Sequence, residues 1–188
     1  MKRIGILGGI GSGKSFVAQI FGCPVFNADK EVGYLYKKDK KIFNKLKKSL
    51  PKYFNKFPVN KNDVTRAILD KDQNLKKIIE IIHLEIRKKM NKFLKKNKNM
   101  KFVVLDIPLL LENKINRKGD ILVFVDSKKN DVLKRLKKRR NFNFKILKKF
   151  QNIQLSLDYK KKKSKFIIKN DFTKKTATKY VKHILKQI

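Results

Sequence analysis

The sequence predicts an α/β protein in which a parallel sheet is covered by helices on both faces. Short apolar runs that end in glycine or aspartate alternate with amphipathic segments of helical length, and this alternation is typical of parallel sheets. A glycine-rich loop follows the first apolar run and matches the phosphate-binding pattern G-x-x-x-x-G-K-S over Gly8–Ser15. No linker divides the 188 residues, so we expect a single domain over residues 1–188.

The expected strands are short apolar runs, and the expected helices carry apolar residues at helical spacing. Strands are predicted at residues 3–7, 24–26, 102–105, 121–125 and 166–168. Helices are predicted at residues 14–21, 31–50, 63–69, 75–94 and 130–139, from after Asn143 to about residue 163, and at 175–188. Residues 51–62 are polar, hold two prolines and are expected to form a loop.

The formal net charge of +36 comes mostly from lysine. The lysine excess accompanies abundant asparagine, isoleucine and phenylalanine, which all have A/T-rich codons, and it is spread along the whole chain. Arginine, the better reader of bases and phosphates, is scarce. We therefore interpret the charge as compositional bias and expect no specific nucleic-acid partner. Lysine runs such as residues 160–163 are expected to be solvated, and the positive field would still attract anionic nucleotides.

No apolar stretch reaches about 18 residues, so no membrane-spanning helix is expected. The apolar run near the start is broken by glycines and by Lys14, unlike the unbroken run of a signal peptide. The single cysteine, Cys23, cannot form an intramolecular disulfide. These features together predict a cytoplasmic location.

The glycine loop is the motif that carries the chemistry. Its glycines allow the N–H groups to turn inward around a polyphosphate, and a helix beginning near Lys14 directs the positive end of its dipole to the same place. Lys14 can reach the outer phosphates, and the Ser15 hydroxyl can hold Mg²⁺. By itself the motif does not distinguish a kinase from a GTPase or an ATPase.

Two aspartates follow predicted strands, at the edge where a parallel sheet has its ligand crevice. Asp29 could orient an attacking hydroxyl and accept its proton, or it could equally be the N-cap of a helix beginning at Glu31. Asp106 could hold a magnesium ion through water, or it could be a turn residue before Pro108.

Basic residues supply further candidates. His83 and Arg87 lie four residues apart on the long predicted helix, so they share a face and could grip an anion. Arg135, Arg139 and Arg140 stand out in a lysine-rich chain, just before a break in the helical pattern. A mobile arginine in such a place could close over a transferring phosphoryl group, although a solvated helix end is the alternative.

Five segments, taken together and in order, resemble the dephospho-CoA kinase family. They are the glycine loop, Pro24–Asp29 (similar to a strand ending in D-A-D), Ile82–Arg87 (H-P-x-I-R), Val104–Glu112 (D-x-P-L-L-x-E), and a last segment from Arg135 through Arg139, Gln154 and Lys160 to Asn170. Many kinases share the glycine loop, whereas the other motifs are together much more specific.

The resemblance implies a P-loop kinase fold with a parallel five-stranded sheet. The core would cover residues 1–30 and 100–188, a helical CoA-binding region about 31–99, and a lid about 138–150. The implied reaction uses ATP and Mg²⁺ to phosphorylate the ribose 3′-hydroxyl of dephospho-CoA, the last step of coenzyme A synthesis.

The same resemblance implies roles for individual residues. Asp29, Lys14 and Arg139 would be catalytic, Ser15 would hold the metal, and Asn170 would lie near the adenine. The nucleotide would be bound by Gly9, Ile10, Gly11, Ser12, Gly13, Lys14, Ser15, Phe16, Arg139 and Asn170. The acceptor dephospho-CoA would be bound by Asp29, His83, Arg87, Asp106, Pro108, Leu109 and Leu110.

The chain departs from the family pattern at three positions and in one segment length. Asn27 replaces the first acid of D-A-D, Leu84 replaces the proline after the histidine, and Lys165 replaces an aspartate before the last strand; the segment between Arg66 and His83 is shorter than usual. The alternatives are a kinase for another small acceptor such as a nucleoside monophosphate, a basic nucleic-acid-binding NTPase, or a catalytically decayed relative. The sequence does not indicate an oligomeric state.

Overall fold

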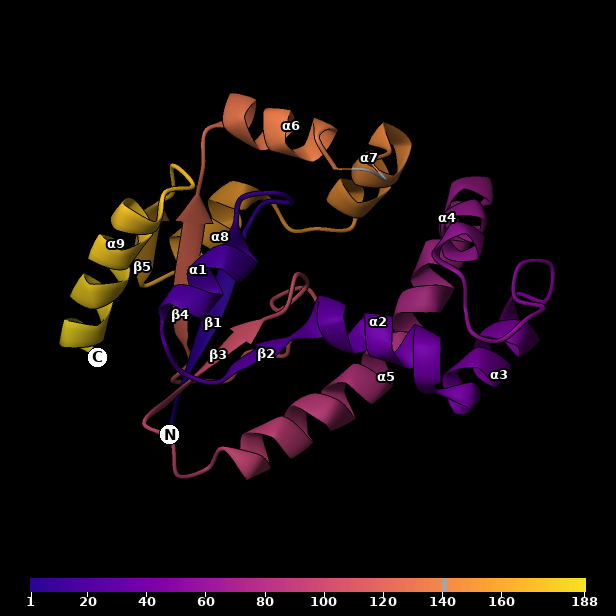
Figure 1. The fold of residues 1–188 in the computed structure, drawn as a ribbon, viewed down its shortest axis with the longest axis horizontal. Helices are drawn as coiled ribbons and strands as arrows, with labels where there is room; N and C mark the ends of the chain where they lie inside the picture. The colour runs from indigo at the N-terminus through magenta and orange to yellow at the C-terminus, as the bar shows by residue number, and fades with distance from the viewer. Residues whose placement is uncertain (140–141) are drawn as a thin grey trace. The chain divides into compact units, whose positions relative to one another are not determined.

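The computed structural model describes residues 1–139 and 142–188. It contains a five-stranded sheet in the order β2-β3-β1-β4-β5, and every pair of neighbouring strands is parallel (Figure 1). The strands are β1 (Lys2–Gly8), β2 (Val25–Asn27), β3 (Phe102–Asp106), β4 (Ile121–Asp126) and β5 (Phe166–Lys169). The predicted α/β class and all five predicted strands are confirmed, each strand to within one residue at either end.

The chain divides into two compact units. Unit 1 holds the sheet and comprises Met1–Asn27, Lys96–Phe142 and Gln151–Ile188. Unit 2 is helical and comprises Ala28–Lys95 and Asn143–Phe150. The division of the chain by function into a core, an acceptor-binding region and a lid stays a prediction.

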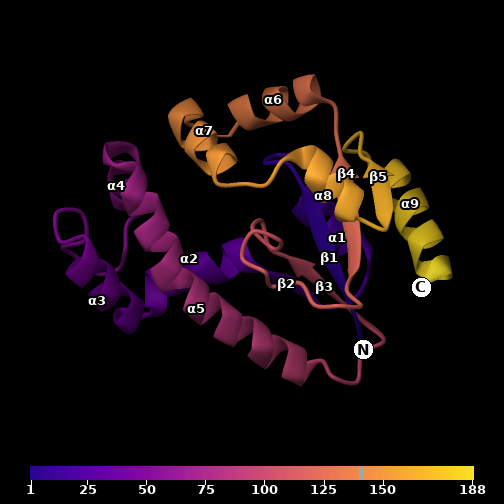
Figure 2. The ribbon, with the colours of Figure 1, turned by 180° about the vertical axis from the view of Figure 1, so that it is seen from behind.

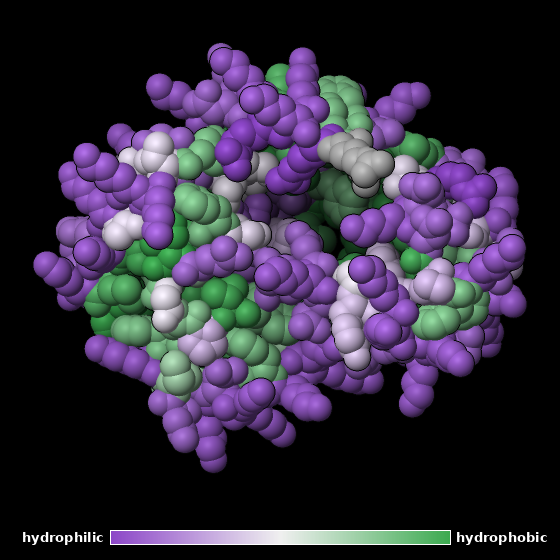
Figure 3. Space-filling model, in the orientation of Figure 1, coloured by the Kyte–Doolittle hydropathy of each residue, from purple (hydrophilic) through white to green (hydrophobic). Residues whose placement is uncertain are grey.

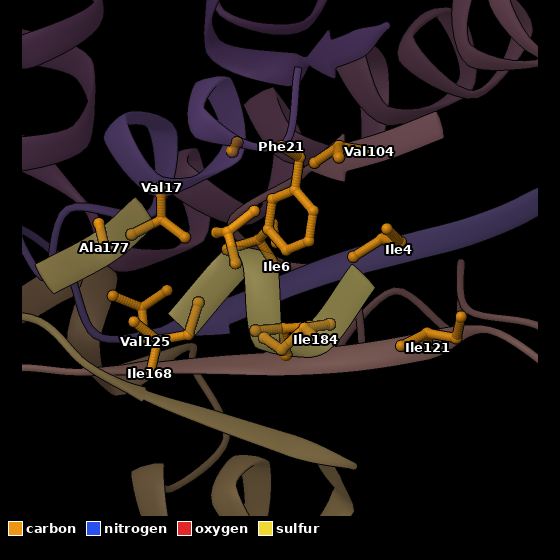
Figure 4. Packing of buried hydrophobic residues seen from close by; sticks show 13 residues of the cluster. Ile4, Ile6, Val17, Phe21, Val104, Ile121, Val125, Ile168, Ala177 and Ile184 are labelled. Carbon is orange, nitrogen blue, oxygen red and sulfur yellow. The ribbon is translucent and has the colours of Figure 1, made fainter. Parts of the chain in front are cut away.

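One face of the sheet is covered by α1 (Lys14–Ile20) and α9 (Lys174–Gln187). Ile4 and Ile6 of β1 are fully buried there and share a core with Val17 of α1 (Figure 4). Alternate residues of β1 face this core because successive side chains of a strand point to opposite faces. The first helix is thereby fixed against the strand that precedes it, which holds the intervening glycine loop at the end of β1.

The opposite face of the sheet is covered by α8 (Leu157–Lys163), which packs against β1 and β4 (Figure 2). Leu110, in the segment after β3, also lies on this face over Gly5 of β1. A Cβ atom at Gly5 would come within 2.6 Å of the Leu110 side chain, so glycine is needed for this close approach. Helices therefore cover both faces of the sheet, as predicted.

Unit 2 is built from helices that each bury apolar residues on one side. They are α2 (Ala28–Lys38), α3 (Lys40–Ser49), α4 (Lys61–Asp70), α5 (Asp72–Lys96) and most of α7 (Phe144–Asn152). The long predicted helix is confirmed as α5, and Ile78, Ile82 and Ile86 are buried along it at helical spacing. No helix in the described part of the chain is long and apolar enough to span a membrane.

Two segments that were predicted as single helices are each divided in two, so these predictions were wrong. Residues 31–50 form α2 and α3, because the Asp39 side chain accepts a hydrogen bond from the Ile42 N–H and caps a new helix. The segment after Asn143 forms α7 and α8, and Ser156 caps α8 in the same way by accepting from the Tyr159 N–H. In both cases a polar side chain satisfies the first turn of the second helix, which lets the chain change direction. The remaining helix, α6 (Lys129–Lys137), follows β4.

Lys160 is buried, although residues 160–163 were predicted to be solvated. Its side chain is 1% exposed and its ammonium lies 2.7 Å from Glu112 Oε1. The Gln154 amide oxygen lies 3.4 Å from the same ammonium, and the Leu155 N–H donates to the same Glu112 oxygen at 3.0 Å. The prediction was wrong for Lys160 because α8 turns this residue toward the sheet, where a charge must be paired; the next three lysines are exposed.

Replacing Lys160 by methionine is expected to lower the free energy of unfolding by about 3–5 kcal/mol, because the Glu112 charge would stay buried without its partner. The adjacent Lys161 is a matched control, since it forms an ion pair with Asp126 whose two side chains are 44% and 40% exposed. Lys161→Met should cost at most about 1 kcal/mol. Denaturant unfolding of both variants measures this difference. Equal losses in the two variants would contradict the importance of the buried pair.

Candidate active site

The carboxyl ends of the strands lie at one edge of the sheet, because all neighbouring strands are parallel. In the pairing register, Asn27 at the end of β2 is opposite Asp106 at the end of β3. Gly8, which ends β1, is opposite Val125 of β4. The glycine loop therefore begins on the edge where polar side chains end the neighbouring strands, which is where open parallel sheets bind ligands.

The loop between β1 and α1 takes conformations that require glycine. Gly11 has a φ angle of 82° and Gly13 a φ angle of 90°, both in the left-handed region. A Cβ atom at Gly11 would lie 2.9 Å from the Leu136 side chain, and a Cβ atom at Gly13 would lie 2.5 Å from Asn170 Nδ2. Other residues are thus excluded by both backbone and neighbours. The predicted strand–loop–helix arrangement is confirmed, since α1 begins at Lys14.

The Lys14 ammonium is held on the loop that precedes it. It donates to the Gly8 carbonyl at 3.1 Å and to the Gly9 carbonyl at 2.7 Å. The side chain therefore folds back over the loop and does not extend away from it. This places a positive charge where the N–H groups of a phosphate-binding loop would hold a polyphosphate.

Three polar side chains meet between the first turn of α1 and the ends of β2 and β3. Asn27 Nδ2 donates to Asp106 Oδ2 at 2.5 Å and lies 3.4 Å from Ser15 Oγ. Asp106 is 3% exposed, whereas Ser15 is exposed. The hydroxyl and carboxylate oxygens are the hard ligands that small divalent cations prefer. The described residues contain no group of three or more His, Cys, Asp or Glu side chains that could form a metal site of their own.

The loop is also held from the other side, through the carbonyl of Ser12. Ser127, directly after β4, donates its hydroxyl to this oxygen at 2.9 Å. Asn170, directly after β5, donates its Nδ2 to the same oxygen at 2.8 Å. The structure thus places Asn170 against the glycine loop; its expected position near the adenine stays a prediction.

Two of the arginines singled out from the sequence lie in different surroundings. Arg135 belongs to α6, and Arg139 follows it. The Arg135 guanidinium lies over the Phe172 ring, 4.2 Å from its centroid. Phe172 in turn lies close to Gly13, where an added Cβ would be 3.2 Å from its ring. Arg139 lies two residues after α6 and is exposed. Arg140, the third arginine singled out from the sequence, and residue 141 of the predicted lid lie outside the described residues.

Asp29 is an exposed residue in the first turn of α2, not an N-cap. The helix begins at Ala28, directly after β2, so Asp29 is its second residue. The alternative that Asp29 caps a helix beginning at Glu31 was therefore wrong, because the helix starts earlier. An acidic group in the first turn still interacts favourably with the helix dipole. Its predicted role as a proton acceptor is left as a prediction.

His83 and Arg87 share one side of α5, as their spacing predicted. Burial, and secondarily the charge of Arg87, lowers the pKa of His83 from its usual 6.5. The ring is therefore neutral at neutral pH. Its Nε2 atom is buried and has no hydrogen-bond partner among the described residues. A buried polar atom without a protein partner is uncommon in a folded protein, and an ordered water or a ligand can satisfy it.

The segment after β3 holds the remaining acceptor candidates. Pro108 and Leu109 are partly exposed. Leu110 is fully buried and packs over Gly5 of β1. The Leu110 side chain therefore belongs to the core beneath the segment, and the expected place of the segment along the acceptor site stays a prediction.

A family model for dephospho-CoA kinase matches residues 2–176 of the chain. The chain belongs to the dephospho-CoA kinase family. A dephospho-CoA kinase of Wolbachia pipientis wMel is 35% identical over 187 residues, which cover 97% of this chain and 95% of the relative. The chain is therefore a nucleotide-binding kinase of the family that completes coenzyme A synthesis.

Solved structures confirm the P-loop kinase fold expected of a dephospho-CoA kinase. A crystal structure from Thermus thermophilus aligns over 100% of this chain and 97% of its own, with a TM-score of 0.76 and 22% identity. The dephospho-CoA kinase from Campylobacter jejuni aligns over 99% of this chain and 96% of its own, with a TM-score of 0.62 and 20% identity. At these identities the comparison concerns the fold alone.

The structure explains two departures of this dephospho-CoA kinase from the family pattern. Asn27 keeps a polar contact with Asp106 but donates a hydrogen bond, so two carboxylates do not face each other there. Leu84 is 61% exposed and lies inside α5, which runs without interruption from Asp72 to Lys96. A proline at this position would remove one helical hydrogen bond, so leucine is compatible with the continuous helix.

Sequence reasoning missed several contributors to the site of this dephospho-CoA kinase. Ser127 was not singled out, although it follows a predicted strand that ends at the same edge as the glycine loop. Phe172 and Arg135 approach each other only through the fold, since 37 positions separate them along the chain. A search for polar residues directly after each predicted strand would have found Ser127, but no local pattern signals the Arg135–Phe172 contact.

Proposed function

We propose that this chain transfers the γ-phosphoryl group of ATP to the ribose 3′-hydroxyl of dephospho-CoA, giving coenzyme A and ADP. The observation that carries the proposal is the Lys14 ammonium held on the glycine loop, together with the contacts of Asn27 to Ser15 and Asp106 at the end of that loop. This arrangement suits phosphoryl transfer, in which catalysis is mostly positioning and electrostatic stabilisation. Membership of the dephospho-CoA kinase family supports the choice of acceptor.

The nucleotide would be bound by the loop and the residues around it. The backbone N–H groups from Gly9 to Phe16 would hold the phosphates, and Lys14 would move from the loop carbonyls to the outer phosphates. Arg139, exposed after α6, would approach the transferring group from the predicted lid. Asn170, which lies next to the loop, would also contribute to nucleotide binding.

The oxygen donors present fit Mg²⁺, which is part of the proposal. The Ser15 hydroxyl would be a direct ligand, and Asp106, oriented by Asn27, would act through water. Few protein ligands are needed, because Mg²⁺ in such sites keeps several waters and binds the substrate phosphates. When bound, the ion would neutralise charge on the β- and γ-phosphates.

The acceptor would be bound and activated by residues from the second, third and fourth of the five segments that resemble the family. Asp29 would orient the 3′-hydroxyl and accept its proton, while the bond from the γ-phosphorus to the β,γ-bridging oxygen breaks and the bond to the 3′-oxygen forms. His83, Arg87 and the Pro108–Leu109 segment would bind the acceptor.

The acceptor can be tested by measuring ADP release with dephospho-CoA and with a panel of nucleoside monophosphates and sugars. We expect turnover with dephospho-CoA and with no other acceptor of the panel. A dephospho-CoA analogue that lacks the 3′-hydroxyl is the matched control and should bind without being phosphorylated. Turnover of a nucleoside monophosphate with dephospho-CoA left unchanged would overturn the proposal, as would ATP hydrolysis that depends on added DNA.

Small molecules are therefore the proposed partners, and a cytoplasmic location is part of the same proposal. Figure 3 shows hydrophilic residues on most of the face that it draws, with hydrophobic residues between them. The interpretation of the +36 charge as compositional bias depends on the spread of lysine along the chain. The absence of a specific nucleic-acid partner stays a prediction.

A further inference from the structure

The Ser12 carbonyl of the glycine loop accepts two side-chain hydrogen bonds from different parts of the chain. One comes from the Ser127 hydroxyl at 2.9 Å and one from Asn170 Nδ2 at 2.8 Å. Ser12 and Asn170 are each 4% exposed, so water competes little for these bonds. Two neighbouring strands, β4 and β5, therefore hold one peptide unit of the loop.

Because the peptide bond is planar, the contacts of the Ser12 carbonyl also set the direction of the Gly13 N–H. In a trans peptide the carbonyl of one residue and the N–H of the next point in opposite directions. Holding the Ser12 oxygen toward Ser127 and Asn170 therefore turns the Gly13 N–H to the other side. These hydrogen bonds fix the conformation of Gly13. Without them its φ angle of 90° would be one of many conformations open to a glycine in a free loop.

The donors that hold the carbonyl are themselves fixed. The Asn170 N–H donates to the Asp126 carbonyl at 2.7 Å, which ties the residue after β5 to the end of β4. Asn170 Oδ1 accepts from the Phe172 N–H at 3.1 Å. Because the amide oxygen is occupied in this way, the amide nitrogen is the atom that faces Ser12. Ser127 directly follows Asp126, so both donors start from the same rigid pair of strand ends.

We infer that Ser127 and Asn170 are positioning residues that turn the Gly13 N–H toward the nucleotide phosphates. The inference rests on the proposed nucleotide site in the glycine loop. Backbone N–H groups that face one anion-binding hollow repel one another electrostatically until an anion is bound. Bonds from outside the loop offset this cost before ATP arrives, and donors arranged in advance need no reorganisation during the reaction.

Ser127→Ala tests the inference more cleanly than a change at Asn170, which has several bonds and an expected place near the adenine. Calorimetry should show that the variant binds ATP and inorganic tripolyphosphate about 3- to 10-fold more weakly, the range supplied by one neutral hydrogen bond. The affinity for adenosine and the KM for dephospho-CoA should not change, because neither depends on the loop N–H groups. Ser127→Thr, which keeps the hydroxyl, should restore most of the affinity.

Ser164→Ala is a matched control. The Ser164 hydroxyl also donates to a backbone carbonyl, that of Lys160, at 2.9 Å, and it is also partly buried. Both alanine variants should lose similar thermal stability, but only Ser127→Ala should lose affinity for tripolyphosphate. Equal tripolyphosphate affinity in the two variants, or an equal loss for adenosine and tripolyphosphate in Ser127→Ala, would overturn the inference.

The same experiment separates this inference from the proposed function. If the unmodified chain binds tripolyphosphate but does not phosphorylate dephospho-CoA, the acceptor assignment fails while the comparison of Ser127 and Ser164 variants still decides the inference. If the unmodified chain binds neither ATP nor tripolyphosphate, the inference and the nucleotide site on which it rests are both wrong.

Discussion

Replacing Lys14 by alanine is expected to reduce kcat/KM on the order of 10²–10³-fold, the range for losing one fixed stabilising group at the transition state. Lys14 brings a cation onto the loop through its contacts with the Gly8 and Gly9 carbonyls. That charge would act on the transferring group, where negative charge is redistributed in the transition state. Steady-state kinetics with ATP and dephospho-CoA would measure the loss.

The control for Lys14→Ala must separate one placed charge from the general positive field of a chain with a net charge of +36. Lys179→Ala removes the same formal charge from an exposed position on α9. It should leave kcat/KM nearly unchanged. Lys14→Ala should keep its melting temperature, because the Lys14 side chain is partly exposed and its hydrogen bonds to the Gly8 and Gly9 carbonyls lie in the loop, outside the core. A Lys14→Ala enzyme with full activity would disprove the phosphate-binding role of the loop.

Asp29→Asn is expected to lower kcat by roughly 10²–10⁴-fold, the usual contribution of a positioned proton acceptor. Asparagine is nearly the same size as aspartate but cannot accept the 3′-hydroxyl proton. Affinity for ATP should change little, since the loop and Lys14 remain. Loss of the Asp29 charge from the first turn of α2 should cost about 0.3–1 kcal/mol through the helix dipole.

Glu31 offers a matched control for Asp29→Asn. Both residues are acidic and lie in the first turn of α2, and Glu31 also forms an ion pair with Lys89 at 3.0 Å. Glu31→Gln should therefore also cost some stability, while kcat stays near normal. If Asp29→Asn shows near-normal kcat with dephospho-CoA, Asp29 serves only the helix, and the acceptor is activated by another group or needs none.

The sequence by itself determined the strands, the glycine loop and the long helix α5. These features depend on local patterns: apolar runs of strand length, a strand–loop–helix motif with glycine at Gly11 and Gly13, and isoleucines at helical spacing. Such patterns act over a few residues, so the tertiary structure does not need to be known. The family was also recognisable, because several short motifs occur in order along the whole chain.

Only the tertiary structure decided which polar residues meet. The sequence pattern predicts that Lys160 is solvated, as one lysine in a run of four. The residue is buried because α8 packs against the sheet, and Glu112 from a distant segment neutralises its charge. Ser127 and Asn170 reach the Ser12 carbonyl because β4 and β5 are neighbours in the strand order. Contacts of this kind depend on which strands pair and which helix faces turn inward. Those are properties of the packed chain, whereas a sequence pattern reports only near neighbours.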